Sequence, residues 1–142
     1  MVFLSMRREV DTAPLIAAAR EGGKRVVAPR MTEQGLEIRE HAEGAPPIAI
    51  GSMRVPEPPE SAALVDPSEV DLVLVPALAL DERGARIGYG AALYDGLLPR
   101  LSRARSIGVA FDFQLIAEVP ETAGDQRVDV VITDRRTIDV AA

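Results

Sequence analysis

Short apolar runs rich in β-branched residues recur along the chain and predict buried strands. They lie at residues 2–4, 26–28, 71–75, 107–111 and 128–133. Pro29 and Pro76 follow two of these runs directly, and proline cannot donate to a strand ladder, so we expect both strands to end there. Residues 36–40 instead alternate apolar and polar positions, which is typical of a half-exposed edge or hairpin strand.

A first helix is predicted between the first two strands. Asp11 or Thr12 supplies its N-cap, Pro14 lies in its first turn, and Gly22-Gly23 ends it. A strand, a helix and a second strand of this size form a β-α-β unit. We therefore expect the two flanking strands to be parallel, with a right-handed crossover.

A second helix is predicted from about Ala91 to Arg103, and we expect Pro99 to kink it or end it early. Short helical turns are expected over residues 61–65 and 113–118. Residues 44–60 contain five prolines and predict an extended, irregular crossing segment. Because strands alternate with helices, the pattern indicates a layered α/β fold with a mainly parallel sheet, followed by an exposed tail.

Composition narrows the functional classes. A chain of 142 residues predicts one domain over residues 1–142, and a net charge of −6 disfavours nucleic-acid and membrane partners. The absence of cysteine excludes disulfides and thiolate catalysis, and the single histidine, His41, excludes a multi-histidine zinc site. No apolar run approaches the roughly 20 residues of a membrane span. The first residues are too short for a signal peptide, so we expect a cytoplasmic protein.

Residues 71–98 form the stretch around which the chain is organised. A buried strand, a polar loop, Gly88-Tyr89-Gly90 and a helix start follow one another there. This order brings backbone N–H groups to the carboxyl end of a strand, where an anion binds well. The alternative is a plain tight turn, which the glycine pair alone favours. The dinucleotide pattern G-x-G-x-x-G fails because its last glycine is replaced by Leu93.

Several side chains near this turn are candidates for ligand binding. Arg83 and Arg86 suit phosphate or carboxylate oxygens, although a solvated loop explains their spacing as well. Asp95 is a candidate Mg²⁺ ligand, or else an acid favoured by the dipole of the helix. The two tyrosines of the chain, Tyr89 and Tyr94, both fall here and suit a flat heteroaromatic ligand.

Polar residues also stand at the ends of other predicted strands. Glu9 follows the first strand, and in a parallel sheet it shares an edge with the glycine turn. The alternative is a surface charge beside two arginines. Asp112 and Gln114 follow the fourth strand, and Asp129 and Asp134 bracket the last. For these four residues, polar strand ends are the simpler interpretation.

Segments spread over nearly the whole chain also carry a family likeness. In order, they are Glu9-Val10-Asp11-Thr12 with Pro14-Leu15-Ile16, Lys24-Arg25-Val26, Val55-Pro56-Glu57-Pro58, Val75-Pro76, Asp81-x-Arg83-Gly84-x-Arg86-x-Gly88-Tyr89-Gly90, Tyr94-Asp95, Gly108-Val109-Ala110-Phe111 and Val128-Asp129. Together they resemble the 5-formyltetrahydrofolate cyclo-ligases, also called methenyltetrahydrofolate synthetases. The segment from Asp81 to Asp95 is the most specific part.

The resemblance implies a three-layer α/β/α fold with a mainly parallel sheet, like that of the NagB/RpiA/CoA-transferase group. It also implies an ATP- and Mg²⁺-dependent enzyme that converts 5-formyltetrahydrofolate to 5,10-methenyltetrahydrofolate and releases ADP and phosphate. The formyl oxygen takes the γ-phosphoryl group, which makes a poor leaving group into a good one. Catalysis of this kind relies on positioning and charge neutralisation.

Residue roles follow by the same resemblance. The catalytic residues are Arg86 and Tyr94, the folate contacts are Glu9, Tyr89 and Met6, and Asp95 is the Mg²⁺ ligand. The nucleotide phosphates face Arg83, Gly88, Tyr89, Gly90, Ala91 and Ala92. The expected partner is 5-formyltetrahydrofolate, and the expected state is a monomer or a small homo-oligomer.

The chain departs from the family pattern at the glycine motif. The family continues Gly-Gly-Gly-(Tyr/Phe)-Tyr-Asp-Arg, whereas this chain reads Gly90-Ala91-Ala92-Leu93-Tyr94-Asp95-Gly96. The basic helical region that precedes the first strand in the family is also absent from this sequence. Three hypotheses follow: an active cyclo-ligase, a relative that binds folate, nucleotide or a protein without turnover, or a structural subunit whose first strand pairs with another chain.

Overall fold

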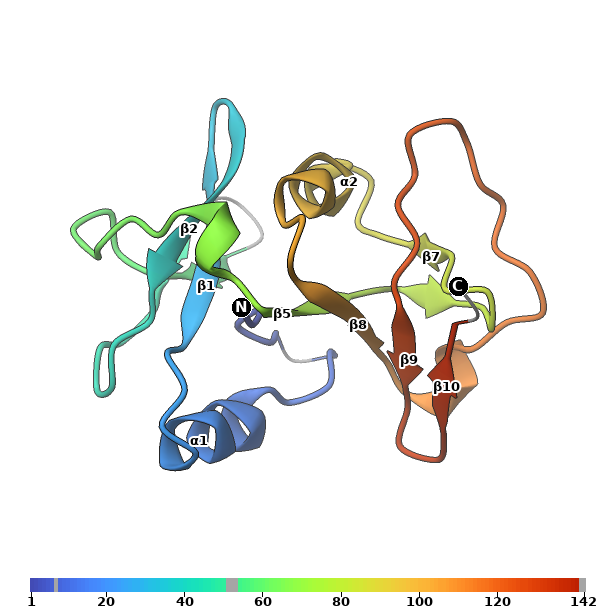
Figure 1. Cartoon of the computed structure of the whole chain (residues 1–142), viewed down its shortest axis with the longest axis horizontal. Helices are drawn as coiled ribbons and strands as arrows, with labels where there is room; N and C mark the ends of the chain where they lie inside the picture. Colours follow the sequence, from blue (N-terminus) through green and yellow to red (C-terminus); the bar gives the residue numbers. More distant parts are fainter. Residues whose placement is uncertain (7, 51–53, 141–142) are drawn as a thin grey trace.

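A four-stranded sheet forms the centre of the molecule in the computed structural model, which describes residues 1–6, 8–50 and 54–140. Its strand order is β10-β9-β8-β5. The strands are β5 (Leu72–Pro76), β8 (Arg105–Val109), β9 (Val130–Ile132) and β10 (Thr137–Asp139). The pairs β5–β8 and β8–β9 are parallel, and β9–β10 is antiparallel (Figure 1).

Three antiparallel hairpins surround this sheet. They consist of β1 (Val27–Thr32) with β2 (Gly35–Glu40), β3 (Ile48–Ile50) with β4 (Val55–Glu57), and β6 (Ala79–Leu80) with β7 (Arg86–Ile87). The fold is therefore α/β, as predicted, but parallel pairing is limited to β5, β8 and β9 among the described strands.

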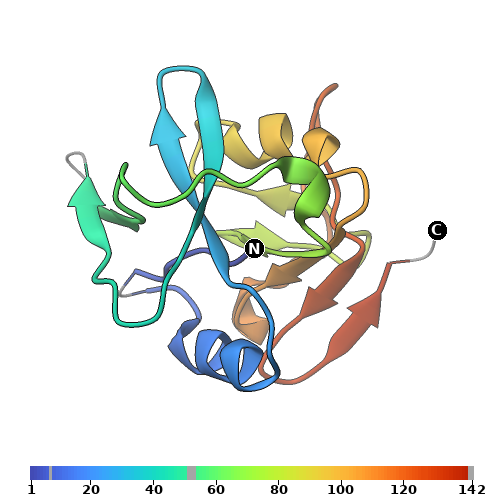
Figure 2. The same cartoon turned by 60° about the vertical axis from the view of Figure 1, so that its left-hand side comes forward.

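The helices are short. They are α1 (Ala13–Glu21) and α2 (Leu93–Leu97), with 3₁₀ turns η1 (Pro67–Glu69), η2 (Leu98–Arg100) and η3 (Asp112–Gln114). The two α-helices lie on opposite sides of the β5–β8 pair (Figure 1), and the β1–β2 hairpin lies toward the same end of the molecule as α2 (Figure 2). Within the described ranges, no helix has the length and apolarity needed to cross a membrane.

The first helix lies where the sequence predicts it, but its N-cap works differently. The Ala13 N–H donates to Asp11 Oδ1 at 3.0 Å, whereas the buried Thr12 hydroxyl donates to the carbonyl of Phe3 at 2.8 Å. Thr12 therefore holds the start of α1 against the N-terminal segment. The helix ends at Gly22, as expected.

The prediction of a parallel β-α-β unit is wrong. β1 pairs with β2 in an antiparallel hairpin, and no regular strand is assigned over residues 2–4. The N-terminal segment instead makes isolated bonds: the Val2 N–H donates to the Val27 carbonyl at 2.9 Å, and the Leu74 N–H donates to the Met1 carbonyl at 3.0 Å.

Pro29 does not end its strand, because β1 continues to Thr32. In an antiparallel ladder, alternate residues direct their backbone groups toward and away from the partner strand. Val27 and Met31, two positions on either side of Pro29, bond outward to Val2 and to the Glu57 side chain. The Pro29 nitrogen therefore faces away from β2, where it costs no ladder bond.

Three further expectations differ from the structure. The second helix is much shorter than predicted, since α2 passes at Leu98 into a 3₁₀ turn that contains Pro99, so the early end is confirmed. The tail expected to be exposed forms β10 against β9. The segment expected to be irregular contains the β3–β4 hairpin, although residues 51–53 lie outside the described ranges.

The core lies between the β5–β8 pair, α2 and the β1–β2 hairpin. Its most buried side chains include Ile38, Val73, Val75, Leu80, Leu97 and Val131. Leu97 is the buried residue of α2, and Leu93 and Tyr94 pack against the same core, so these contacts position the short helix and the loop before it.

Candidate active site

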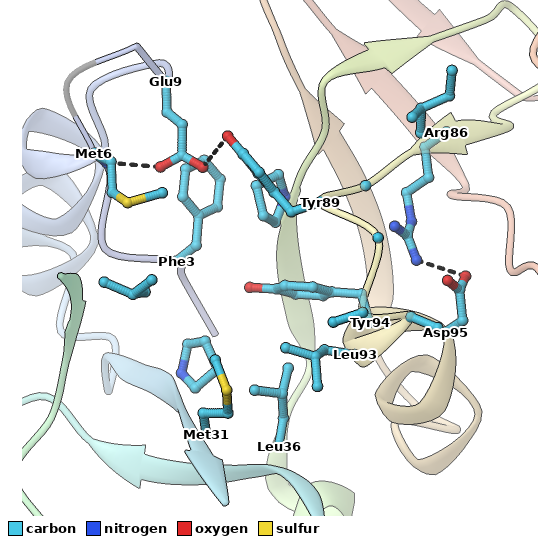
Figure 3. A pocket seen from close by; sticks show the side chains of 18 of the residues that line it. Phe3, Met6, Glu9, Met31, Leu36, Arg86, Tyr89, Leu93, Tyr94 and Asp95 are labelled. Carbon is cyan, nitrogen blue, oxygen red and sulfur yellow. Dashed lines mark hydrogen bonds and ion pairs between the residues drawn. The ribbon is translucent and has the colours of Figure 1, made fainter. Parts of the chain in front are cut away.

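A cavity of about 530 Å³ opens beside Pro76, the last residue of β5. Its walls come from the N-terminal segment, the β1–β2 hairpin, β4, and the loop between β7 and α2. A volume in this range suits a small-molecule ligand. The predicted site residues that line it are Met6, Glu9, Arg86, Tyr94, Asp95 and the run from Gly88 to Ala92 (Figure 3).

Glu9 and Tyr89 meet in the wall of this cavity, although 80 residues separate them in sequence. The Tyr89 hydroxyl donates to Glu9 Oε1 at 2.9 Å, and the Met6 N–H donates to Glu9 Oε2 at 2.7 Å (Figure 3). Burial and the hydrogen bond to Glu9 raise the pKa of Tyr89 to about 12. Tyr89 therefore stays protonated at neutral pH and donates to the carboxylate.

The contact between Glu9 and Tyr89 also marks a boundary. A second cavity, about 600 Å³, lies on the other side and is lined by both residues, together with Phe3 and Pro76. Gln114, a candidate from the sequence, lines this second cavity and donates through Nε2 to the carbonyls of two residues after β5. The two cavities therefore share one wall at the carboxyl end of β5.

Arg86 and Asp95 form a partly buried ion pair at the opposite end of the main cavity (Figure 3). Arg86 Nη2 lies 2.7 Å from Asp95 Oδ1, which also accepts the Gln126 N–H at 2.9 Å. The side chain of Arg86 is only 4% exposed, and its Cζ lies 5.9 Å from the centre of the Tyr94 ring. Its Nε is buried without a hydrogen-bond partner among the described residues, so this donor is free for a ligand.

Tyr94 points into the cavity from α2, and the Tyr89 side chain lies on the side of it nearer Glu9 (Figure 3). Burial, reinforced by the negative charge of Glu9, raises the pKa of Tyr94 well above its usual value. Its hydroxyl therefore remains a neutral donor and acceptor inside the cavity. The two tyrosines supply the aromatic surface predicted from the sequence.

The loop from Gly88 to Ala92 presents a run of free backbone donors. Within the part of the chain that the structure describes, none of its five N–H groups donates a hydrogen bond to protein. Gly90 has φ +94°, and Ala92 adopts a left-handed conformation with φ 50°. Because α2 is only five residues long, the anion-binding character predicted for this turn comes from the loop amides more than from a helix dipole.

Arg83 is not among the cavity-lining residues. Its guanidinium pairs with the fully buried Asp81 at 2.8 Å and donates to the Val119 carbonyl at 3.2 Å. Asp81 in turn accepts the N–H groups of Arg83, Ala85 and Val119. The Asp81-x-Arg83 motif therefore shapes the loop that leads to Arg86, and the nucleotide contact expected for Arg83 has no geometric support.

Three other acidic residues proposed from the sequence, Asp112, Asp129 and Asp134, make hydrogen bonds at the ends of strands. Asp112 pairs with Arg136 at 2.8 Å, and Asp129 accepts the N–H and hydroxyl of Ser106. Asp134 accepts the Asp112 N–H at 2.7 Å. Each of these three carboxylates joins two neighbouring segments, which agrees with the simpler interpretation of their positions.

Several lining residues escaped sequence reasoning. Glu57 and Asp125 add carboxylates to the main cavity, and Met31, Leu36 and Leu93 add apolar surface. Glu57 carried a signal in the sequence, since it is an acid held directly between two prolines. Asp125 lies in a polar loop without such a signal.

Two carboxylates near Arg86, those of Asp95 and Asp125, are the candidate metal ligands of the cavity. Among the described residues, no cluster of three or more potential metal-binding side chains occurs. Asp95 and Asp125 nevertheless line the same cavity, and no described residue donates to Asp95 Oδ2. One or two carboxylates with substrate phosphate oxygens are the usual Mg²⁺ ligands, so this donor set fits that ion.

Fold and cavity together define an α/β protein with a candidate ligand site at the carboxyl end of a parallel strand pair. The family model described as the 5-formyltetrahydrofolate cyclo-ligase family matches residues 1–134. The chain therefore belongs to the 5-formyltetrahydrofolate cyclo-ligase family.

Individual relatives agree with this assignment. The 5-formyltetrahydrofolate cyclo-ligase of Escherichia coli K12 is 31% identical over 93% of this chain and 75% of its own length. The enzyme of the same name from Mycolicibacterium smegmatis is 32% identical over 96% of this chain and 73% of its own length. The NMR structure of 5,10-methenyltetrahydrofolate synthetase from Aquifex aeolicus superposes with a TM-score of 0.81 at 28% identity, covering 99% of this chain and 71% of that one.

Proposed function

We propose that this protein catalyses the ATP-dependent closure of 5-formyltetrahydrofolate to 5,10-methenyltetrahydrofolate, with release of ADP and phosphate. The formyl oxygen attacks the γ-phosphorus and ADP leaves; N10 then attacks the activated carbon, and the former formyl oxygen departs with phosphate. The observation that carries the proposal is one cavity lined at one side by Glu9 and Met6 and at the other by Arg86 and Asp95. That arrangement supports two substrates held in contact.

The nucleotide phosphates are assigned to the loop from Gly88 to Ala92. Its free N–H groups offer donors to phosphate oxygens, and the unpartnered Nε of Arg86 adds a cationic one. Mg²⁺, when bound, would neutralise phosphate charge, and Asp95 with Asp125 would hold it. The ion pair with Arg86, at 2.7 Å, fixes the direction of the Asp95 carboxylate.

Reduced folate is assigned to the side of the cavity formed by the N-terminal segment. Glu9 and the Tyr89 hydroxyl present polar atoms near the formyl group, and Met6 offers an apolar contact. Tyr94 lies between the two groups of residues and stays protonated, so it is assigned to hydrogen-bond the transferring oxygen. Apolar walls around these groups exclude water, which would otherwise compete with N10.

Several coarser features are part of the same proposal. A single domain over residues 1–142, with the three-layer α/β/α plan of the NagB/RpiA/CoA-transferase group, is supported by the placement of α1 and α2 on opposite sides of the β5–β8 pair. A cytoplasmic location, and a monomer or small homo-oligomer without nucleic-acid or membrane partners, accord with the acidic composition.

An absorbance assay for the methenyl product, with 5-formyltetrahydrofolate and MgATP, tests the activity directly. Product formation supports the proposal, and its absence together with calorimetric binding of folate or nucleotide supports the second hypothesis. Ala91, Ala92 and Gly96 motivate that alternative, because they replace two glycines and a basic residue of the family motif. A protein that binds neither substrate yet forms a stable oligomer is the structural subunit of the third hypothesis.

A further inference from the structure

Glu57 places a buried carboxylate in the wall of the main cavity, at the end of β4. The residue is 3% exposed. Its Oε1 accepts the Met31 N–H at 3.1 Å, whereas Oε2 is buried and accepts no hydrogen bond from the described residues. A buried carboxylate oxygen without a donor costs free energy, so this oxygen calls for a partner.

The neighbouring cation does not supply that partner. Arg30 Nη1 lies 3.9 Å from Glu57 Oε2, beyond hydrogen-bond distance, and it donates to the Pro58 carbonyl at 3.0 Å. Arg30 also approaches Glu37 at 3.8 Å. It therefore offsets charge near Glu57 without filling the acceptor site. Burial raises the pKa of the Glu57 carboxyl. A hydrogen-bond donor from a ligand would lower this pKa again, because it stabilises the ionised form.

The surroundings of Glu57 indicate the shape of that ligand. Apolar residues line the same cavity, namely Pro29, Met31, Leu36, Val55 and Pro56, and Met31 contacts Glu57 directly. Such walls accept the faces of a flat ring, and the carboxylate accepts an N–H at the ring edge. Glu9 and Arg86 belong to other walls and are already hydrogen-bonded, so Glu57 offers an additional contact.

We propose that Glu57 Oε2 accepts a hydrogen bond from the 2-amino-4-oxopyrimidine edge of reduced folate. This edge carries adjacent N–H donors, and a carboxylate is the acceptor that suits them best. The contact fixes the direction in which the ring enters the cavity, and it favours pteridines that carry the amino group. The inference rests on the proposed function, because it names a specificity contact for the same substrate.

Glu57→Gln tests the contact with little change of shape. Its amide oxygen still accepts the Met31 N–H, while its NH₂ group replaces the acceptor oxygen by a donor. Affinity for 5-formyltetrahydrofolate, measured by calorimetry, is expected to fall by about 10-fold or more. Affinity for MgATP is expected to stay the same. Glu37→Gln is the matched control, since Glu37 also neighbours Arg30 but does not line the cavity.

A folate analogue with hydrogen in place of the 2-amino group identifies the donor. It is expected to bind the natural protein more weakly than 5-formyltetrahydrofolate does, and this preference for the 2-amino compound should be lost in Glu57→Gln. If removal of the 2-amino group lowers affinity equally for the natural protein and for Glu57→Gln, the proposal is overturned. If Glu57→Gln misfolds, the affinities of the two ligands for the natural protein decide the question alone. Equal affinity of the natural protein for 5-formyltetrahydrofolate and the analogue then overturns the proposal.

Failure of the inference and failure of the proposed function give different results. If the natural protein does not bind 5-formyltetrahydrofolate, both are wrong. If it binds the folate and forms product while Glu57→Gln binds as tightly, the cyclo-ligase function stands and the Glu57 contact is wrong.

Discussion

At the scale of single residues, the Arg86–Asp95 pair shows how one contact serves both structure and chemistry. The Arg86 side chain is only 4% exposed, so removal of the Asp95 charge is costly because it leaves this buried cation without its partner. Its position in the cavity wall leaves Arg86 Nε and Asp95 Oδ2 for ligands. A neutral, isosteric substitution therefore probes the chemistry with least damage to the fold.

Asp95→Asn is expected to lower kcat/KM for MgATP by about 10- to 100-fold, since it removes a charged contact to the metal–phosphate group. Steady-state kinetics over a range of Mg²⁺ concentrations measures this effect. Asp139→Asn, an exposed acid on β10, is the control and should behave like the natural protein. Turnover that is unchanged in Asp95→Asn would remove Asp95 from the site.

Ala92 is a second residue whose effect is predictable. Its φ of 50° is a left-handed conformation that costs an L-residue roughly 1–2 kcal/mol, whereas Ala91 has no such φ. Ala92→Gly is therefore expected to raise the free energy of unfolding by about 0.5–1 kcal/mol, and Ala91→Gly to lower it slightly. Urea unfolding of both variants measures the difference. Equal effects would contradict the conformation of this loop.

At the scale of elements, the turn between β6 and β7 supports the site from outside the cavity. Asp81 collects three N–H groups and the Arg83 guanidinium, and this cluster directs β7 so that Arg86 enters the cavity. Gly84 completes the turn with φ +79°. Family motif residues outside the cavity thus keep a clear structural role.

Gly84→Ala is expected to destabilise the protein by about 2–4 kcal/mol, because its Cβ would lie 2.4 Å from the Val128 carbonyl oxygen. Gly90→Ala is the matched control, since Gly90 also has positive φ (+94°), but a Cβ added there would meet no described atom within 4 Å. Thermal unfolding separates the two effects. Similar losses in both variants would show that backbone strain, and not the contact with Val128, sets the cost.

At the scale of the whole molecule, acidic groups make stability depend on pH. Burial alone would raise the pKa of Asp81, but the N–H groups and the Arg83 guanidinium outweigh it and lower that pKa below 3.8. Salt bridges and hydrogen bonds also lower the pKa of Asp112 and Glu121. The unfolded chain therefore binds more protons than the native protein once the pH falls toward these values.

The free energy of unfolding is accordingly expected to be highest above the ordinary carboxyl pKa and to fall as the medium is acidified through the lower native values. Asp81→Asn removes one such group, so its stability should decline less steeply over the same acid range, although the variant is less stable at neutral pH. Urea titrations at a series of pH values measure both slopes. If the free energy of unfolding depends on pH with the same slope in Asp81→Asn and in the natural protein, the lowered pKa of Asp81 is contradicted.

Local patterns in the sequence identified β1, β2, β5, β8 and β9, the start and end of α1, and the early end of the second helix at Pro99. They also identified Glu9, Arg86, Tyr89, Tyr94 and Asp95, because polar residues after buried strands and beside glycines gather at one sheet edge. Such features depend on neighbours within a few residues, so side-chain periodicity and backbone preference are enough to reveal them.

Only the tertiary structure decided which partners these segments take. It paired β1 with β2 instead of with the N-terminal segment, turned Arg83 toward Asp81, and brought Glu57 into the cavity beside Met31. The physical reason is that strand pairing, ion pairing and burial depend on distances between residues far apart in the chain. Apolar periodicity records that a strand is buried, but not which strand or side chain lies against it.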